Sequence, residues 1–341
     1  MKKAYNLSRE LDFCIKDVKS RVDSRIIAFQ VRPEIKEGEI FLRGFVHCPQ
    51  QETALLDALG KIPGLGGRGI PIHSRLKILS RKKLRFFQVK TPWTDLRLNP
   101  KQKADLGTQV LIGSFVLHYF SKGEYCFCSE PTGYLGYVKK KDLIEKTKKD
   151  YIRWLNGPRG RILGEVVNGR VFLPPGAELP CADKAHVILP DGKVFRVDKN
   201  LLQFRNPSES KKPASLLKHA HSFLRAPYLW GGLSRKGIDC SGFAQLMYLL
   251  QNIPLPRDTC QQVGIGRLVG MLGDCSDLLP GDLLFFMGKE GRIIHVGISL
   301  GGDRFIHATY KDGIRESRID DIDYSGGRYR EWYILSRRIL L

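Results

Sequence analysis

The pattern of apolar and polar positions divides the first 80 residues into helix-type and strand-type segments. Helical spacing of apolar residues alternates with short β-type runs. The expected helices cover about 8–22 and 50–59, and the expected strands cover 26–31, 39–46 and about 70–79. Their order predicts a small α/β unit over residues 1–80, with a strand–helix–strand unit in its second half. No motif in this unit carries chemistry, so the pattern leaves its role open.

The pattern changes after residue 80, where short strand-like runs recur at close spacing with turn residues between them. These runs cover 86–89, 109–115, 116–120, 125–128 and 135–138. Several short strands at this spacing predict a small barrel or sandwich over residues 81–150. Residues 151–205 carry a weaker version of the same pattern. A polar, proline-bounded linker at 206–213 and a helix at 214–224 then open the last part of the chain.

The stretch from Tyr228 to Leu250 combines a glycine-rich turn with an apolar run of helical spacing. Asp239 or Ser241 can cap the start of that helix, which places Cys240 at its N-terminus. The partial positive charge of a helix N-terminus favours a thiolate, which is the nucleophilic form of cysteine. A cysteine taken alone is more often a small buried apolar residue, so the assignment depends on its partners.

Two histidines further along the chain supply such partners. β-type runs around His295 and His307 flank the pair Gly301-Gly302, which predicts a β-hairpin. With a three-residue loop at 300–302, positions 295 and 307 oppose each other on one face of the hairpin. A cysteine with histidines distant in sequence is the layout of a thiol hydrolase. We therefore predict Cys240 as nucleophile, His295 as base and His307 as the orienting group.

Six segments of the last third of the chain carry a family resemblance. They are 227–232 (PYLWGG), 239–243 (DCSGF), 256–262 (PRDTCQQ), 278–286 (LLPGDLLFF), 295–298 (HVGI) and 305–308 (FIHA). In this order they resemble the motifs of the NlpC family, papain-like cysteine peptidases of bacterial cell-wall peptides. The resemblance implies an α+β, papain-like domain over residues 214–341. It also implies that Cys240, His295 and His307 are the three catalytic positions.

A second resemblance concerns the β-type units ahead of this domain. The pattern V-x-x-P-W-x-x-L-R followed by T-G-Y-L-G-Y-V within residues 81–150 resembles a bacterial SH3-like domain. It departs from that pattern at Tyr125 and Tyr137, where tryptophan is frequent. Residues 151–205 resemble a second, more degenerate copy. The resulting fold expectation is α+β overall, with β-barrel SH3-like domains between the α/β unit and the catalytic domain.

This order of domains is similar to that of the γ-D-glutamyl-L-diamino acid endopeptidases. The resemblance implies cleavage of cell-wall stem peptides that carry a free N-terminal L-Ala, as in remodelling or recycling. It also implies that Tyr228, Asp239 and Ser241 hold the substrate amine. An SH3-like domain would wall off the cleft and contribute an aromatic side chain, for which we name Tyr134 or Tyr137.

Two other function classes fit the same motifs. A thiol amidase or acyltransferase on the same fold would accept a lipid or another amide. A non-catalytic wall-binding protein would use only its SH3-like domains, although the complete set of one cysteine and two histidines argues against it. A panel of substrates with and without a free L-Ala separates these alternatives.

The net charge of +21 is unevenly distributed. Residues 215–341 hold 16 Lys and Arg against 13 Asp and Glu, whereas the rest of the chain holds 40 against 22. A basic front part attracts anionic partners such as carboxylate-rich peptides or lipid surfaces. The basic residues are scattered among acidic ones, which favours a solvated surface instead. We therefore expect cell-wall peptides, and no nucleic acid, as partners.

The remaining composition excludes several classes of protein. None of the eight cysteines is spaced C-x-x-C, so no zinc pattern is present and we expect neither metal nor cofactor. There is no run of 18 apolar residues that could form a spanning helix. The start MKKAYNLSRELDFCIKD lacks the apolar core of a Sec signal peptide. These features predict a cytoplasmic protein, with export by another route left open, and a monomer as the simplest state.

Overall fold

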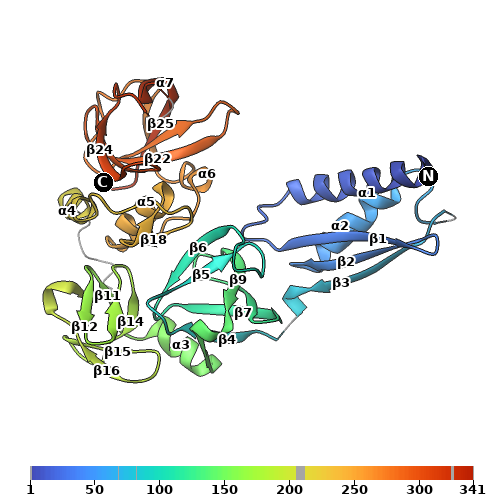
Figure 1. Cartoon of the computed structure of the whole chain (residues 1–341), viewed down its shortest axis with the longest axis horizontal. Helices are drawn as coiled ribbons and strands as arrows, with labels where there is room; N and C mark the ends of the chain where they lie inside the picture. The colour runs from blue at the N-terminus through green and yellow to red at the C-terminus, as the bar shows by residue number, and fades with distance from the viewer. Residues whose placement is uncertain (1, 68, 82, 205–211, 324–325, 341) are drawn as a thin grey trace.

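The computed structural model describes residues 2–67, 69–81, 83–204, 212–323 and 326–340. Most of the expected linker at 206–213 lies outside these residues. Figure 1 shows the α/β unit at the N-terminal end extending to one side, joined to two β-rich units that lie below the C-terminal domain. The chain is therefore a mixed α/β protein with many strands, as the sequence predicts.

The N-terminal unit places two helices beside a three-stranded sheet. Its elements are α1 (Lys2–Ser20), β1 (Phe29–Lys36), β2 (Glu39–Val46), α2 (Pro49–Gly60) and β3 (Ile72–Ile78). β1 runs antiparallel to β2 and β3 runs parallel to it, which confirms the predicted strand–helix–strand unit. The first strand was predicted too early, because β1 continues through Pro33. A proline is tolerated there because β1 is an edge strand, where a missing N–H costs no ladder bond.

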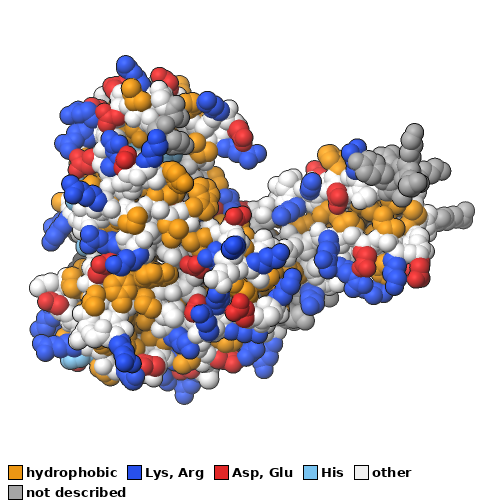
Figure 2. All heavy atoms as spheres, viewed as in Figure 1, with side chains coloured by type: hydrophobic (Ala, Val, Ile, Leu, Met, Phe, Trp, Pro, Cys, Tyr) orange, Lys and Arg blue, Asp and Glu red, His pale blue; other side chains and the backbone are white. Residues whose placement is uncertain are grey.

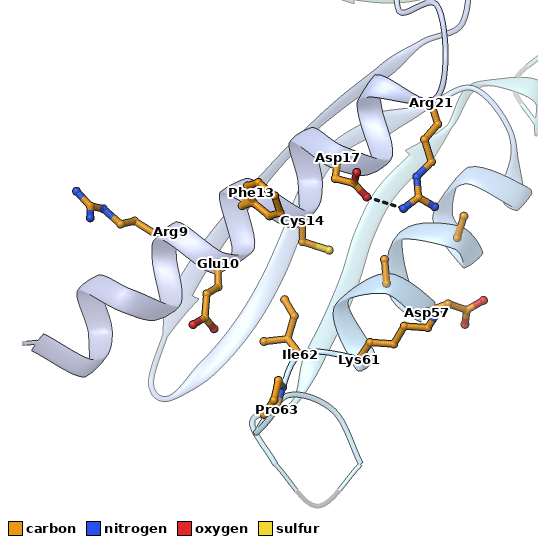
Figure 3. A pocket seen from close by; sticks show the side chains of 12 residues that line it. Arg9, Glu10, Phe13, Cys14, Asp17, Arg21, Asp57, Lys61, Ile62 and Pro63 are labelled. Carbon is orange, nitrogen blue, oxygen red and sulfur yellow. Dashed lines mark hydrogen bonds and ion pairs between the residues drawn. The ribbon is translucent and has the colours of Figure 1, made fainter.

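A groove runs along this unit between α1 and α2 (Figure 3). Its volume is about 880 Å³, and Phe13 in its wall is 76% exposed. Arg21 and Asp17 form an ion pair at one end of it. The groove contains none of the residues that the sequence singles out for chemistry.

Residues 85–146 contain one antiparallel sheet of seven strands in the order β10-β4-β7-β8-β9-β5-β6. The strands are β4 (Arg85–Val89), β5 (Trp93–Arg97), β6 (Leu106–Leu111), β7 (Phe115–Lys122), β8 (Tyr125–Ser129), β9 (Leu135–Lys139) and β10 (Leu143–Lys146), with short 3₁₀ turns at Leu79–Arg81 and Lys140–Asp142. Buried Val89, Leu96 and Val116 belong to its core. This all-β unit agrees with the predicted class, and its assignment as SH3-like stays a prediction.

The next unit consists of one helix and short strands in three small sheets. Its elements are α3 (Lys148–Asn156), β11 (Arg159–Ile162), β12 (Val166–Asn168), β13 (Val171–Leu173), β14 (Glu178–Pro180), β15 (His186–Ile188), β16 (Val194–Arg196), a 3₁₀ turn at Lys199–Leu201 and β17 (Leu202–Phe204). Arg161 donates to the Leu249 carbonyl of the C-terminal domain at 2.6 Å and to Glu178 at 2.7 Å. This buried side chain ties the unit to the domain that follows.

The C-terminal domain packs a central helix against a six-stranded antiparallel sheet of order β20-β25-β21-β22-β23-β24. Its helices are α4 (Pro213–Ser222), α5 (Cys240–Leu249), α6 (Thr259–Gln262) and α7 (Tyr329–Trp332), and its strands are β18 (Leu233–Ser234), β19 (Gly237–Ile238), β20 (Arg267–Met271), β21 (Leu283–Met287), β22 (Ile293–Gly301), β23 (Arg304–Thr309), β24 (Gly313–Arg318) and β25 (Tyr333–Arg338). α5 contacts β22 and β23, burying Phe243, Leu246 and Val296.

The predicted hairpin forms with a different register. Ile298 pairs with Ile306 and Gly301 with Arg304, with an irregularity in between, so the turn is shorter than the predicted loop at 300–302. The direct pairing of positions 295 and 307 is therefore wrong by two residues. Because side chains alternate with a period of two, a shift of two keeps both residues on the same face. The histidines become diagonal neighbours instead of direct partners.

None of the helices among the described residues is long and apolar enough to cross a membrane. On the face seen in Figure 2, Lys and Arg side chains are spread over all the units and lie among acidic ones. This distribution agrees with a solvated basic surface.

Candidate active site

The cysteine that the sequence singles out begins the central helix. α5 starts at Cys240, and Asp239 caps it by accepting a bond from the Gly242 amide at 2.7 Å. Asp239 is thus the cap, and Ser241 lies in the first turn. Cys240 is 7% exposed, and the amide of Val296 donates a hydrogen bond to its sulfur. The thiol therefore lies against β22, beside the residue that follows His295.

The two histidines meet on the sheet next to this thiol. Nε2 of His295 lies 2.7 Å from Nδ1 of His307, and Nε2 of His307 lies 3.1 Å from Oγ of Ser317. His307 is completely buried. Because His295 uses Nε2 toward His307, its Nδ1 is the nitrogen left for the cysteine. The structure thus brings Cys240, His295 and His307 to one place, although they come from three different elements.

The ionisation of the site differs from the expectation for a helix N-terminus. Burial, and then the negative charge of Asp239, raise the pKa of the Cys240 thiol to about 12. Burial lowers the pKa of His295 to about 4. Burial also lowers the pKa of His307 well below its ordinary value. Burial thus opposes the thiolate that a helix N-terminus favours, and it favours a neutral thiol beside a neutral imidazole in the resting site.

Arg257 lies in the motif segment 256–262; the sequence leaves open whether it lines the cleft or is an ordinary surface loop residue, and it does not indicate the contacts that Arg257 makes. Its guanidinium donates to Asp239 at 2.8 Å, to the Ser241 hydroxyl at 2.7 Å and to the Thr108 hydroxyl at 2.9 Å. Arg257 is only 2% exposed. It thus holds both residues that flank Cys240. No local pattern around residue 257 indicates this role, because Thr108 lies 149 positions earlier in the chain.

Thr108 belongs to a contact surface on β6 that packs against the catalytic domain. The Gln109 side chain accepts a bond from the Leu233 amide at 3.0 Å. Gly231 has a φ of +78°, and a Cβ there would lie 2.6 Å from the Leu106 carbonyl oxygen. Only glycine allows this close approach of the two backbones. The seven-stranded unit therefore forms part of the surroundings of the Cys240 segment.

The aromatic residues named from the sequence have different positions. Tyr228 is half-buried, and its ring contacts that of Tyr310 edge to face at 5.8 Å. Tyr134 is 5% exposed, with its hydroxyl bonded to Asp258 of the catalytic domain, and burial raises its pKa. Tyr137 is buried in another cluster, where its ring lies 4.9 Å from that of Phe127 in a tilted arrangement. Tyr137 as a cleft residue is therefore wrong, whereas Tyr134 lies at the domain contact.

The N-terminal unit also reaches this region, through the segment between α1 and β1. Arg25 donates to Asp258 at 2.9 Å, and Asp23 accepts from Gln261 at 2.7 Å. The Arg25 carbonyl accepts from the Leu135 amide at 2.7 Å. These bonds join three units at the chain segment that contains Arg257.

We expect Arg257→Ala to destabilise the protein by about 3–5 kcal/mol, because it leaves the buried Asp239 carboxylate without its partner. Urea unfolding of the full chain measures this change. Arg318→Ala serves as the control, since Arg318 pairs with Asp303 on the surface and its loss costs about 1 kcal/mol or less. Equal effects of the two substitutions would contradict a special role for the Arg257–Asp239 pair.

Comparison with known proteins places the chain in a family. The NlpC/P60 family profile matches residues 225–333. A γ-D-glutamyl-L-lysine dipeptidyl-peptidase of Bacillus subtilis (strain 168) is 31% identical over 216 residues, which are 59% of this chain and 71% of the relative. The chain belongs to the NlpC/P60 family. The probable endopeptidase NlpC of Escherichia coli (strain K12) is 40% identical over 111 residues, which are 32% of this chain and 70% of the relative.

A solved structure of another NlpC/P60 family protein has a similar fold. The crystal structure of an NlpC/P60 family protein from Bacillus cereus ATCC 10987 superposes with a TM-score of 0.66 at 22% identity, covering 75% of this chain and all of that one. About a quarter of the chain has no counterpart there. As a member of the NlpC/P60 family, the protein is a cysteine peptidase. Among the described residues, no group of three or more His, Cys, Asp or Glu could hold a metal ion.

Proposed function

We propose that this NlpC/P60 protein hydrolyses peptidoglycan stem peptides at the bond between γ-D-glutamate and the diamino acid. The observation that carries this proposal is the length of the match to the B. subtilis dipeptidyl-peptidase. That match spans 216 residues, whereas the family profile covers only 225–333, so the similarity extends into the β-rich units. The match to the endopeptidase NlpC spans only 111 residues.

In the proposed mechanism, Nδ1 of His295 takes the proton of the Cys240 thiol as the sulfur attacks the γ-glutamyl carbonyl carbon. The neutral starting state agrees with the raised pKa of Cys240 and the lowered pKa of His295. The amide N–H of Cys240 is at the first turn of α5, outside the helical ladder, and can donate to the oxyanion together with the Tyr228 hydroxyl. The C–N bond then breaks, the amine takes the proton from His295, and water hydrolyses the thioester.

The proposed substrate carries a free N-terminal L-Ala, held by Tyr228, Asp239 and Ser241. The support is that Asp239 and Ser241 flank Cys240, that Tyr228 pairs with Ile238 just ahead of it, and that dipeptidyl-peptidases act at a free N-terminus by definition. The oxygens of Asp239 already accept from Gly231, Gly242 and Arg257. Because Asp239 is already paired with Arg257, binding of the ammonium would exchange one of these contacts for the substrate amine.

We expect N-acetylation of L-Ala-γ-D-Glu-diaminopimelate to lower kcat/KM by about 10–100-fold, the equivalent of one lost charged hydrogen bond. Mass spectrometry of the reaction products measures both peptides under the same conditions. Equal cleavage of the free and acetylated peptides would contradict recognition of the amine. Cleavage of neither peptide, with turnover of a lipid or another amide, would favour a different thiol amidase or acyltransferase.

A further inference from the structure

The hydrogen-bond chain of the site continues beyond the second histidine. Nε2 of His307 lies 3.1 Å from the Ser317 hydroxyl, which comes from β24 at the far edge of the sheet. Ser317 is also hydrogen-bonded to the phenol of Tyr329. His307 is fully buried and Ser317 is 5% exposed. Water therefore has little access to these groups, and each must find its partner within the protein.

The positions of the protons in this chain depend on one another. For His295 to accept the thiol proton at Nδ1, its Nε2 must carry hydrogen and donate it to Nδ1 of His307. His307 then carries its own hydrogen on Nε2, which needs an acceptor. In the opposite arrangement, Nδ1 of His295 would carry the hydrogen and point it at the thiol. His295 could then not accept the thiol proton and could not act as a base. The acceptor beyond His307 thus decides which arrangement is stable.

We propose that Ser317 is a positioning residue that fixes the tautomers of His307 and, through it, of His295. Its hydroxyl oxygen accepts from Nε2 of His307, while its own hydrogen is donated to the Tyr329 oxygen. A donated bond to that oxygen stabilises the phenolate, in agreement with the lowering effect of Ser317 on the pKa of Tyr329. The inference rests on the proposed function, because it assigns His295 the role of base.

The ring of Tyr329 packs against the imidazole of His307 and limits its orientation. It contacts the His307 ring edge to face at a centroid distance of 5.2 Å, and Phe305 contacts the same imidazole at 4.5 Å. On the other side, a Cβ on Gly297 would lie 3.4 Å from the His307 Cβ. The imidazole is thus confined between neighbours, and among the described residues its Nε2 makes its polar contact with the Ser317 hydroxyl.

The same domain contains a matched serine–tyrosine pair without a histidine. Ser336 on β25 is fully buried, and its hydroxyl lies 2.9 Å from the Tyr333 phenol. Ser336→Ala removes a buried hydroxyl from a tyrosine partner, as Ser317→Ala does, without touching the imidazoles. It therefore reports what the loss of such a bond costs in stability alone.

The test compares both variants in the full-length chain. We expect Ser317→Ala to lower kcat by about 10–100-fold, the usual cost of losing a group that orients a functional histidine, with little change in KM. Ser336→Ala should change kcat less than twofold. Ser317→Thr, which keeps a hydroxyl, should recover activity toward that of the unsubstituted protein. If Ser317→Ala and Ser336→Ala change kcat equally, the inference is wrong.

A second measurement does not depend on turnover. The ¹⁵N chemical shifts of labelled histidines report which ring nitrogen carries the hydrogen. We expect His295 and His307 to carry it on Nε2, and expect Ser317→Ala to mix the tautomers while Ser336→Ala does not. Unchanged tautomers in Ser317→Ala would overturn the inference and leave the proposed function intact. If Cys240→Ala instead retains full turnover, the proposed function fails.

Discussion

Replacing Cys240 by alanine is expected to lower kcat for cleavage of L-Ala-γ-D-Glu-diaminopimelate by about 10⁴-fold or more, because the substitution removes the nucleophile. The sulfur forms the covalent bond to the substrate carbonyl, and no neighbouring group in the proposed mechanism replaces it. The rate of dipeptide release, followed by mass spectrometry, measures this loss. Substrate binding should change much less, since the thiol makes no charged contact with the peptide.

The control is Cys275→Ala in the same domain. Cys275 and Cys240 are both 7% exposed, so the two substitutions remove a sulfur from equally buried positions. Cys275 lies in a separate apolar cluster with Leu278 and Phe286, and its replacement should leave kcat within about twofold. A Cys240→Ala variant that keeps a tenth or more of the original rate would show that another residue attacks the substrate.

The local elements of the site could be predicted from the sequence because they depend on short-range patterns. The apolar spacing after Cys240 predicts α5, and the structure starts that helix at this residue with Asp239 as its cap. The β-type runs around His295 and His307 likewise predict the strands that carry them. Helix capping and apolar periodicity depend on a few consecutive residues, so both can be recognised in the sequence without knowledge of the fold.

The register and the long-range contacts could not be predicted in the same way. The hairpin gains an irregularity between Ser299 and Gly301, which no rule of turn length indicates. Arg257 resembles an ordinary loop residue until Thr108 and Asp239 are seen on either side of it. Ser317 lies in a strand of mixed polarity, and only the fold of the sheet brings it to His307. Such contacts depend on the tertiary packing and leave no periodic signal.

The ionisation of the site follows from burial, which a helix-terminus argument does not include. A helix N-terminus favours an anion by a modest amount, typically about 0.3–1 kcal/mol at exposed positions. Removal of a thiolate from water costs several times more. Burial therefore favours the neutral forms of Cys240 and His295. Formation of the thiolate then coincides with attack on the substrate instead of preceding it.

The histidine substitution tests whether His295 takes part in the proton transfer. His295→Gln keeps a polar side chain of similar size but removes the base, and it is expected to lower kcat by about 10²–10⁴-fold. His221→Gln is the control: His221 is exposed, bonds to Glu316 on the surface of the same domain, and should leave the rate unchanged. The two variants therefore separate the loss of the base from the loss of any imidazole.

The pH profile gives the same test with the unsubstituted protein. A base must be neutral, and burial lowers the pKa of His295 to about 4, so activity should persist at pH 5–6 and fall only as the pH drops through about 4. An exposed histidine would instead lose activity near its ordinary value of about 6.5. In His295→Gln, the residual rate should rise with pH as hydroxide replaces the missing base. An acid limb centred near pH 6.5 would mean that His295 is solvated and would contradict its lowered pKa. A preformed ion pair would instead lose activity on the alkaline side, as the imidazolium gives up its proton.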